Sequence, residues 1–461
     1  MLAGFMLTRV LHVVKPANFV GGEGSHALDE VTLEFSRFAL GIQLVFAGVH
    51  LPRDFLRVEW RSLSLLLGPG LFAMWAFSTA IILLLVPNLP ILHALAISSC
   101  ITPTDPVLSA SIIEGRFADR NIPNGLRNLI LAESGINDGL GYPFLFFSLI
   151  IMEYTAVDSN AEGGIMAGLS LFLWRTCLYK VAASVIYGWL VGTAARRLLG
   201  WAHEKQYIGR ESLVTSSMAM ALSILGTCGM AGADDVLACF IAGSVLSWDD
   251  WFRVQTMEDS FQHAIDMLLN EAMFMWLGAV CPWESFWNSE VVAWWRLLLV
   301  GIAILLFRRL PVILAMHRFI HHIEHVGHAL FVGYFGPIGV SATFYLCLGL
   351  RFSRRLRHDP DTGALDEMKL LEDNMTVIVW FVVVVSVVSF VFLRLSSSSP
   401  LADGSFKVVH GLSVPIGVLG WRVGELIGRR GGQRSFFSRE TPLVSNGRLL
   451  SESNDHSYGT V

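Results

Sequence analysis

Long apolar runs, separated by short polar segments, dominate the first 395 residues. Each run is about as long as the ~20 residues with which an α-helix crosses a bilayer. The pattern therefore predicts an all-α polytopic membrane protein with about eleven complete crossings, preceded by an apolar remnant at 1–14 that is too short to span. The predicted crossings are 31–51, 62–87, 91–114, 128–152, 165–199, 211–230, 235–248, 265–281, 294–317, 328–350 and 374–393.

Composition supports the same class. Hydrophobic residues make up 53% of the 461 positions and charged residues only 15%, whereas an average soluble domain has about 25% charged residues. All six cysteines lie in or beside apolar runs without CxxC spacing, so we interpret them as packing residues and not as a disulfide or zinc framework. The net charge of −5 gives no indication of nucleic-acid binding, and the expected surrounding partner is the lipid bilayer.

Arginines in the loops predict an orientation. Arg53, Arg57 and Arg61 follow the first complete crossing, and such loops are typical of the cytoplasmic side. With this loop inside, the acidic loop 153–164 falls outside and three further loops fall inside, at 115–127, 196–210 and 249–262. The loop 351–373 is an exception, because it falls outside although it contains Arg351, Arg354, Arg355 and Arg357. Either this loop departs from the positive-inside tendency or one crossing is miscounted.

The last part of the chain differs in composition. Segment 396–461 begins with a serine run and is polar and rich in Gly and Ser from residue 428. Such a composition cannot bury enough apolar surface to fold. We therefore predict a transmembrane domain over 1–395 and a short, largely disordered cytoplasmic tail over 396–461.

The crossing 128–152 contains Glu133, Asn137 and Asp138 inside an otherwise apolar run. Arg127 marks one membrane surface, and eleven helical residues give a rise of roughly 16 Å, which places Asp138 near the middle of a bilayer core of roughly 30 Å. A charge at that depth costs about 2.5–3.5 kcal/mol. Asp138 is either part of a buried polar cluster that ties helices together or a site for a cation and a proton.

The crossing 91–114 is predicted to be broken in mid-membrane. Pro103 and Pro106 cannot donate backbone hydrogen bonds, and non-helical backbone at this depth is tolerated only where it is buried or lines a cavity. Thr102, Thr104 and Asp105 lie within the break. Their oxygens and the released carbonyls are ligands that hard alkali cations prefer. The alternative is a proline kink with a capping aspartate.

A matching break is predicted in the crossing 328–350, where Gly336, Pro337 and Gly339 interrupt the apolar run. Two interrupted crossings at corresponding places of two halves indicate a secondary transporter built from inverted repeats. We expect the half-helix dipoles of both breaks to face a shared centre.

Arg308 and Arg309 lie inside the crossing 294–317. Arginine stays charged and has little room to reach water from a central position. We expect at least one of them to pair with a carboxylate, with Glu133 as the candidate, or to compensate the dipoles of the broken helices. The alternative is a helix that ends early at Pro311, with both arginines at its cytoplasmic end.

Other polar positions are less informative. Asp234 and Asp235 precede a short apolar segment, where carboxylates suit a helix N-terminus, so we favour a capping role. Three polar residues in the crossing 265–281 either contribute to an ion pathway or mark the start of a helix: Asp266, Asn270 and Glu271.

Four histidines have spacings that a metal ion could use: His321, His322, His325 and His328. Because they lie beside Glu324 in a connector that is expected to be cytoplasmic, we favour a solvated cluster that responds to pH.

Six motifs in chain order resemble the fungal plasma-membrane sodium/proton antiporters of the monovalent cation/proton antiporter superfamily. The resemblance covers roughly residues 1–420, and its motifs are TPTDPVLSASI, ESGINDGLGYPF, DDVLACFIAGSVLSWDDWF, FRRLP, GYFGPIGVSA and HGLSVPIGVLG. It implies an inverted-repeat fold with two unwound, crossing helices, a dimerisation domain, a mobile ion-binding core and a homodimer. Members usually begin with one more helix, so the resemblance implies an N-terminally shortened chain.

The resemblance also implies roles for individual residues. Asp138 would hold the transported Na⁺ or a proton, with Asn137 before it; the unwound helix would contribute Thr104 and Asp105; Glu133 and Arg309 would be charges that support the core.

The expected function is exchange of cytosolic Na⁺, and also Li⁺ or K⁺, for external H⁺ in the plasma membrane, serving ion homeostasis, salt tolerance and pH regulation. We expect no enzymatic activity and no cofactor. The alternatives are a K⁺-selective exchanger, an anion transporter or a channel. An intramembrane aspartyl protease would need a GxGD loop, and the sequence contains none.

Overall fold

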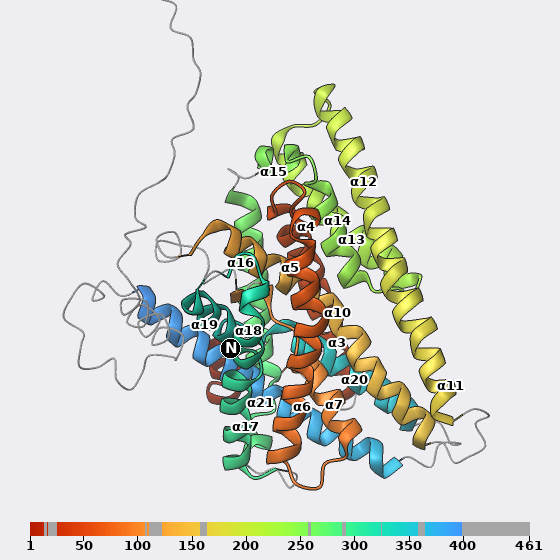
Figure 1. Cartoon of the computed structure of the whole chain (residues 1–461), viewed down its shortest axis with the longest axis vertical. Coiled ribbons are helices and arrows are strands. Elements are labelled where there is room, and N and C mark those ends of the chain that lie inside the picture. The colour runs from red at the N-terminus through yellow and green to blue at the C-terminus, as the bar shows by residue number, and fades with distance from the viewer. Residues whose placement is uncertain are drawn as a thin grey trace, which may run out of the picture.

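The computed structural model describes residues 1–12, 16, 25–106, 108–109, 122–156, 164–256, 260–287, 292–323, 325–357 and 365–398. Within these ranges every regular element is a helix (Figure 1), which confirms the predicted all-α class. The predicted tail lies outside the described residues from 399 onward. Seven described segments are long and apolar enough to cross a membrane: His26–His50, Trp60–Leu85, Asn124–Thr155, Gly164–Glu204, Glu211–Met230, Trp294–Phe319 and Glu367–Val391.

Most predicted crossings coincide with one helix. These helices are α3 (Ser25–His50), α10 (Asn124–Ala156), α13 (Arg210–Met230), α14 (Asp235–Leu246), α16 (Ser260–Val280) and α21 (Leu365–Ser398). Short elements lie between them or at the start of the chain: α1 (Leu2–Phe5), η1 (Met6–Val10), α4 (Phe55–Val58), α15 (Trp251–Thr256), η4 (Trp283–Phe286) and η5 (His317–Phe319).

Two crossings contain stretches of π-helix. The crossing predicted at 62–87 consists of α5 (Trp60–Leu65), η2 (Leu66–Gly70) and α6 (Leu71–Leu85). Pro69 lies within η2, where it lacks the donor that a regular turn requires. The crossing predicted at 165–199 consists of α11 (Gly164–Leu171), η3 (Phe172–Ala182) and α12 (Ala183–Glu204).

Three crossings are broken. The first consists of α7 (Ile91–Ile101), after which the backbone is non-helical to Asp105. The second consists of α19 (Val326–Tyr334) and α20 (Val340–Arg357), with non-helical backbone at 335–339. Both breaks were predicted from proline and glycine. The third break was considered only as an alternative, in the form of a helix that ends early at Pro311. In the structure, Arg308 and Arg309 separate α17 (Trp294–Phe307) from α18 (Leu310–Met316), whose first turn contains Pro311.

Helix α14 is packed between α3 and α12 through glycines (Figure 1). A Cβ atom at Gly48 of α3 would lie 2.6 Å from the Phe240 carbonyl oxygen of α14. Cβ atoms at Gly188 and Gly192 of α12 would lie equally close to carbonyl oxygens on the opposite face of α14. Small residues allow such backbone contact, and van der Waals packing then drives helix association in a bilayer.

The broken crossings lie in a second group of helices. Helix α7 packs against α6, α10, α20 and α21, and α17 packs against α6 and α21. The unwound backbone is therefore enclosed by helices, as backbone without regular hydrogen bonds requires within a membrane.

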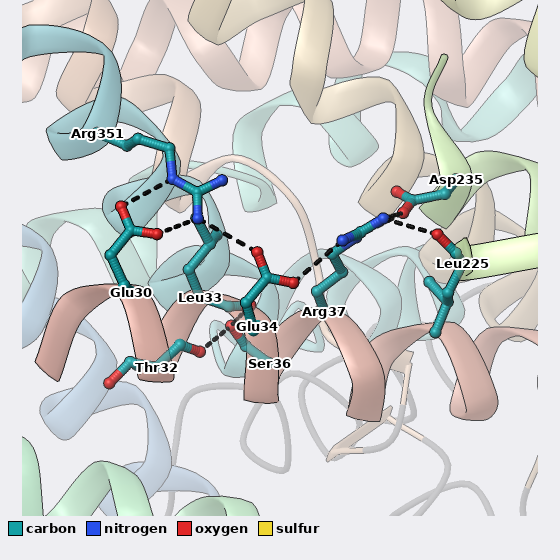
Figure 2. Close-up of polar contacts among 9 residues, drawn as sticks. All are labelled: Glu30, Thr32, Leu33, Glu34, Ser36, Arg37, Leu225, Asp235 and Arg351. Carbon is teal, nitrogen blue, oxygen red and sulfur yellow. Dashed lines mark hydrogen bonds and ion pairs between the residues drawn. The ribbon is translucent and has the colours of Figure 1, made fainter. Parts of the chain in front are cut away.

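A chain of ion pairs joins α3, α14 and α20 (Figure 2). Arg351 of α20 binds Glu30 and Glu34 of α3, and Glu34 also binds Arg37 at 3.0 Å. Arg37 in turn binds Asp235 and donates to the Leu225 carbonyl oxygen at 2.7 Å.

Further arginines of the segment 351–373 pair with carboxylates in the same way. Besides Arg351, Arg354 pairs with Asp29 and Arg357 pairs with Glu372. Three of the four arginines that conflicted with the predicted orientation are therefore partly neutralised by carboxylates on neighbouring helices. The side of the membrane on which this segment lies stays a prediction.

Candidate functional site

The two predicted breaks meet at one place. The Asp105 amide donates to the Pro337 carbonyl oxygen at 2.9 Å, so the backbone of one break is bonded to that of the other. The Asp105 carboxylate accepts from the Val340 amide, at the start of α20, at 2.9 Å, and from the Leu108 amide at 3.1 Å. Asp105 thus places a negative charge at two half-helix N-termini, where the helix dipole is positive. The two breaks thus meet at a shared centre, as expected. Asp105 caps a helix there, which was the alternative interpretation of this residue.

Helix α10 completes the polar groups of the first break. The Asn137 side chain accepts from the Thr104 amide at 3.0 Å and donates to the Thr104 hydroxyl at 2.8 Å. The Thr104 hydroxyl also contacts the Ser134 hydroxyl at 3.1 Å. Thr102 donates to the Ser98 carbonyl oxygen at 2.6 Å, within its own helix, and its place among cation ligands stays a prediction.

Asp138 is the exceptional side chain of this centre. It is 0% exposed, and neither carboxylate oxygen has a hydrogen-bond partner among the described residues. The Tyr345 hydroxyl donates to the backbone carbonyl of Asp138 and not to its carboxylate. Asp105 and Ser341 lie near this carboxylate. The Ser341 hydroxyl also has no hydrogen-bond partner in the described part of the chain. A buried carboxylate whose oxygens are not used by the protein is suited to bind a proton or a hard cation.

Arg309 forms the ion pair that was expected with Glu133. Its guanidinium binds both carboxylate oxygens, at 2.7 and 2.6 Å, and the two side chains are 2% and 1% exposed. Arg309 also donates to the Val332 carbonyl oxygen at 2.9 Å, near the end of α19. Two parallel hydrogen bonds fix the relative position of α10 and the break before α18.

Arg308 has the second role that was expected of this pair of arginines. It donates to the carbonyl oxygens of Ile101 and Gly336, and lies 3.3 and 3.4 Å from those of Thr102 and Pro103. These carbonyls belong to the end of α7 and to the second break, where the dipole is negative. Arg308 therefore stabilises the carbonyl ends of the breaks, while Asp105 stabilises the amide ends.

Glycines make the close approach possible. A Cβ atom at Gly339 would lie 2.0 Å from an oxygen of Asp105, and one at Gly336 would lie 2.7 Å from the Arg309 side chain. On α10, Gly135 and Gly139 are covered by Phe240 and Leu237 of α14. These two glycines leave room for α14 beside α10.

We expect Gly339→Ala to destabilise the protein. The added methyl group would displace the Asp105 carboxylate from the Val340 amide, and such overpacking costs about 1–3 kcal/mol. Gly226→Ala in α13 is the matched control, because nothing lies within 4 Å of a Cβ atom there. Thermal unfolding in detergent measures the difference; equal unfolding temperatures for the two variants would contradict the contact.

The remaining candidates lie outside this centre. Asp234 accepts from the Leu237 amide at 3.1 Å, which confirms the predicted helix cap, and Asp235 belongs to the ion pairs of Figure 2. Asn270 accepts a hydrogen bond from Gln43 at 2.9 Å and thereby joins α16 to α3. A role of Asp266, Asn270 and Glu271 in an ion pathway stays a prediction.

Tyr345 and Ser341 were not predicted as site residues from the sequence. Ser341 directly follows Val340, the first residue of α20, so its position after the predicted break was a usable signal. Tyr345 lies one turn further along the same helix, and nothing in the local sequence separates it from an ordinary buried tyrosine.

Comparisons with known proteins agree with this architecture. Residues 1–396 match the family described as sodium/hydrogen exchanger, transmembrane. A Schizosaccharomyces pombe protein named "probable Na⁺/H⁺ antiporter" is 34% identical over 426 residues, which is 92% of this chain and 53% of that protein. Na⁺/H⁺ antiporter 2 of Zygosaccharomyces rouxii is 37% identical over 317 residues, or 68% of this chain and 38% of that protein.

The fold has a counterpart of known structure. The structure of the sodium proton antiporter MjNhaP1 from Methanocaldococcus jannaschii at pH 8 superposes with a TM-score of 0.61, covering 87% of this chain and 91% of that one at 15% identity. This chain spans about half, or less, of the length of the two fungal relatives. Since the family match extends over most of its length, the chain belongs to the sodium/hydrogen exchanger family of transmembrane proteins.

Proposed function

We propose that this chain exchanges cytosolic Na⁺ for external H⁺, with Li⁺ and K⁺ as further substrates, at a single site on Asp138. The observation that carries the proposal is the buried Asp138 carboxylate, whose oxygens have no hydrogen-bond partner in the described residues and which lies beside two crossing, broken helices. The names of the fungal relatives and of the archaeal structure, all sodium or Na⁺/H⁺ antiporters, support the same activity.

The mechanism is competition for the same oxygens. A proton on Asp138 removes the charge that attracts a cation, and a bound cation disfavours protonation. Movement of the site between the two sides of the membrane then exchanges one ion for the other, and the proton gradient drives the cation outward. Thr104, Asn137 and Asp105 hold the unwound backbone in place around this carboxylate. The reaction needs no cofactor and makes or breaks no covalent bond apart from proton transfer.

Assembly and location follow from the same family. We propose a homodimer in the plasma membrane, with the tail after residue 398 in the cytoplasm. The arginines around Arg53, and Arg196 in the second half of α12, support the proposed orientation.

The test of the exchange activity uses purified protein in liposomes that contain a pH-sensitive dye and carry an imposed proton gradient. Na⁺, Li⁺, K⁺ or choline is added outside in turn. We expect a pH change with the alkali cations and none with choline or with protein-free liposomes. A response to K⁺ alone would favour a K⁺-selective exchanger, whereas alkali-cation flux without proton movement would favour a channel.

We also expect the exchange to be electroneutral. Glu133 is bound to Arg309 through both oxygens, so Asp138 alone is left to carry a proton, and one proton then replaces one monovalent cation. In K⁺-free liposomes whose membrane potential is set with gradients of the permeant anion thiocyanate, which is not a proposed substrate, the initial rate of Na⁺-dependent pH change should be the same at positive, zero and negative potentials. A rate that depends steeply on the potential would contradict a single carrier carboxylate.

A further inference from the structure

A cluster of possible metal ligands lies outside the site at Asp138. Glu59, His321 and His322 each offer one ligand atom, and these atoms all lie within 4.8 Å of one another. Glu59 lies between α4 and α5, whereas the two histidines follow η5 in the connector to α19. The three residues are thus brought together from segments more than 250 positions apart in the sequence. This connector carries part of the histidine cluster that the sequence analysis noted.

The carboxylate of Glu59 is held in a defined orientation. Its Oε2 atom accepts a hydrogen bond from the Ser62 hydroxyl at 3.0 Å. Its Oε1 atom is thereby presented to His322, with Nε2 at 3.1 Å. That contact does not have the geometry of a hydrogen bond, and Nε2 of His322 has no hydrogen-bond partner among the described residues. A hydrogen-bonded carboxylate beside an imidazole with an unused nitrogen is the arrangement that metal sites use to orient their ligands.

The position of His322 is fixed by α10. A Cβ atom at Gly125 would lie 2.6 Å from Cε1 and Nδ1 of His322, so the imidazole rests against the first turn of that helix. His321 is exposed, and its ring lies edge to face with that of His322, with ring centres 5.1 Å apart. The exposed ring can turn toward the other two ligands and leaves the centre accessible from solvent.

We propose that Glu59, His321 and His322 form a binding site for a divalent transition-metal ion of the Zn²⁺ type. Two imidazoles and one carboxylate are a ligand set that Zn²⁺ binds in tetrahedral geometry, with the fourth position open to water. Ligand atoms of such a site lie about 3.4 Å apart. The Glu59–His322 distance of 3.1 Å already fits, and the other ligand distances are at most 4.8 Å. Mg²⁺ and Ca²⁺ prefer oxygen ligands and should not bind.

The chemistry of the surroundings is compatible with this assignment. Arg57 and Arg61, the cations next to Glu59 in the sequence, are exposed, and Arg61 lies over the Trp60 ring, 5.6 Å from its centre. Solvent therefore screens their charge. A bound ion would connect the start of α5 with the connector to α19. We expect it to stabilise the folded protein, because it binds the native arrangement and not the unfolded chain.

The test titrates the purified chain with Zn²⁺ alone, and separately with Mg²⁺, by isothermal calorimetry in detergent. The variants are His322→Ala and Glu59→Gln, with His325→Ala as the matched control in the same connector. We expect the wild type and the control to bind one more equivalent of Zn²⁺ than the two site variants, or to bind it at least ten times more tightly. Mg²⁺ should give no heat from this site.

Thermal unfolding gives a second readout that does not depend on transport. Zn²⁺ should raise the unfolding temperature of the wild type and of His325→Ala, and should leave that of His322→Ala unchanged. The metal-free proteins should unfold at the same temperature, which shows that the substitutions leave the fold intact. Equal stoichiometry and affinity in all four proteins, or an equal effect of Zn²⁺ on their unfolding, would overturn the proposal.

Discussion

Asp138→Asn is expected to reduce cation-dependent proton movement in liposomes to the level of protein-free vesicles. An amide cannot bind and release a proton in the accessible pH range, and it does not carry the charge that holds a cation in a buried site. The variant can therefore bind neither the proton nor the cation, and the two ions cannot be exchanged. The pH-dye assay with Na⁺, Li⁺ and K⁺ measures this loss.

The same substitution should leave the fold intact or make it more stable. The Asp138 oxygens have no hydrogen-bond partner in the described structure, so the amide removes a charge whose burial costs about 2.5–3.5 kcal/mol without breaking an ion pair. The unfolding temperature in detergent should be equal to that of the wild type or higher. Asp249→Asn is the matched control, because that carboxylate is 49% exposed and lies 3.9 Å from Arg196; its exchange should be normal. Normal exchange in Asp138→Asn would refute the assignment of the carrier.

Breaking the Glu133–Arg309 pair should have the largest effect on stability. Each partner is almost completely buried, so Glu133→Met or Arg309→Met leaves a buried charge without its counter-ion, at a cost of about 3–5 kcal/mol. The double variant removes both charges and replaces them with apolar side chains. We expect the double variant to lose clearly less free energy of unfolding than the two single variants lose in sum.

Denaturant unfolding in detergent micelles measures this coupling as a double-mutant cycle. Arg253→Met is the control, since the Arg253–Asp250 pair has similar bidentate geometry but is partly exposed; its loss should cost about 0–1 kcal/mol. If the changes in the free energy of unfolding from the Glu133 and Arg309 variants add up to that of the double variant, the two residues are not energetically coupled. That result would contradict the proposed cost of breaking this buried ion pair.

The broken helices could be predicted because their causes are local. Pro103, Pro106 and Pro337 lack backbone donors wherever they lie, and the sequence places them in the middle of apolar runs. Asp138 was recognisable for a similar reason, since a carboxylate at the centre of an apolar segment is costly whatever surrounds it. The pairing of Arg309 with Glu133 was named as a candidate, because few opposite charges are available at that depth.

The division of roles between neighbouring groups was not predictable in the same way. Arg308 and Arg309 are adjacent and chemically identical, yet one binds carbonyls of two breaks and the other binds a carboxylate. Asp105 reaches the Val340 amide across 235 positions of the sequence. Such assignments depend on how the crossings are rotated against one another, which helix–helix packing decides and periodicity along one chain does not show. The break at Arg308 was underestimated because Pro311 was read as a possible end of the helix and not as a step within the crossing.

The complementary charges of Asp105 and Arg308 have a consequence for turnover. Each broken end already has a fixed counter-charge supplied by the protein, the carboxylate at the amide ends and the guanidinium at the carbonyl ends. In the proposed exchange, a cation or proton that leaves Asp138 would therefore not expose an uncompensated dipole. The ion at Asp138 could then change without a change in the charges that hold the broken ends in place.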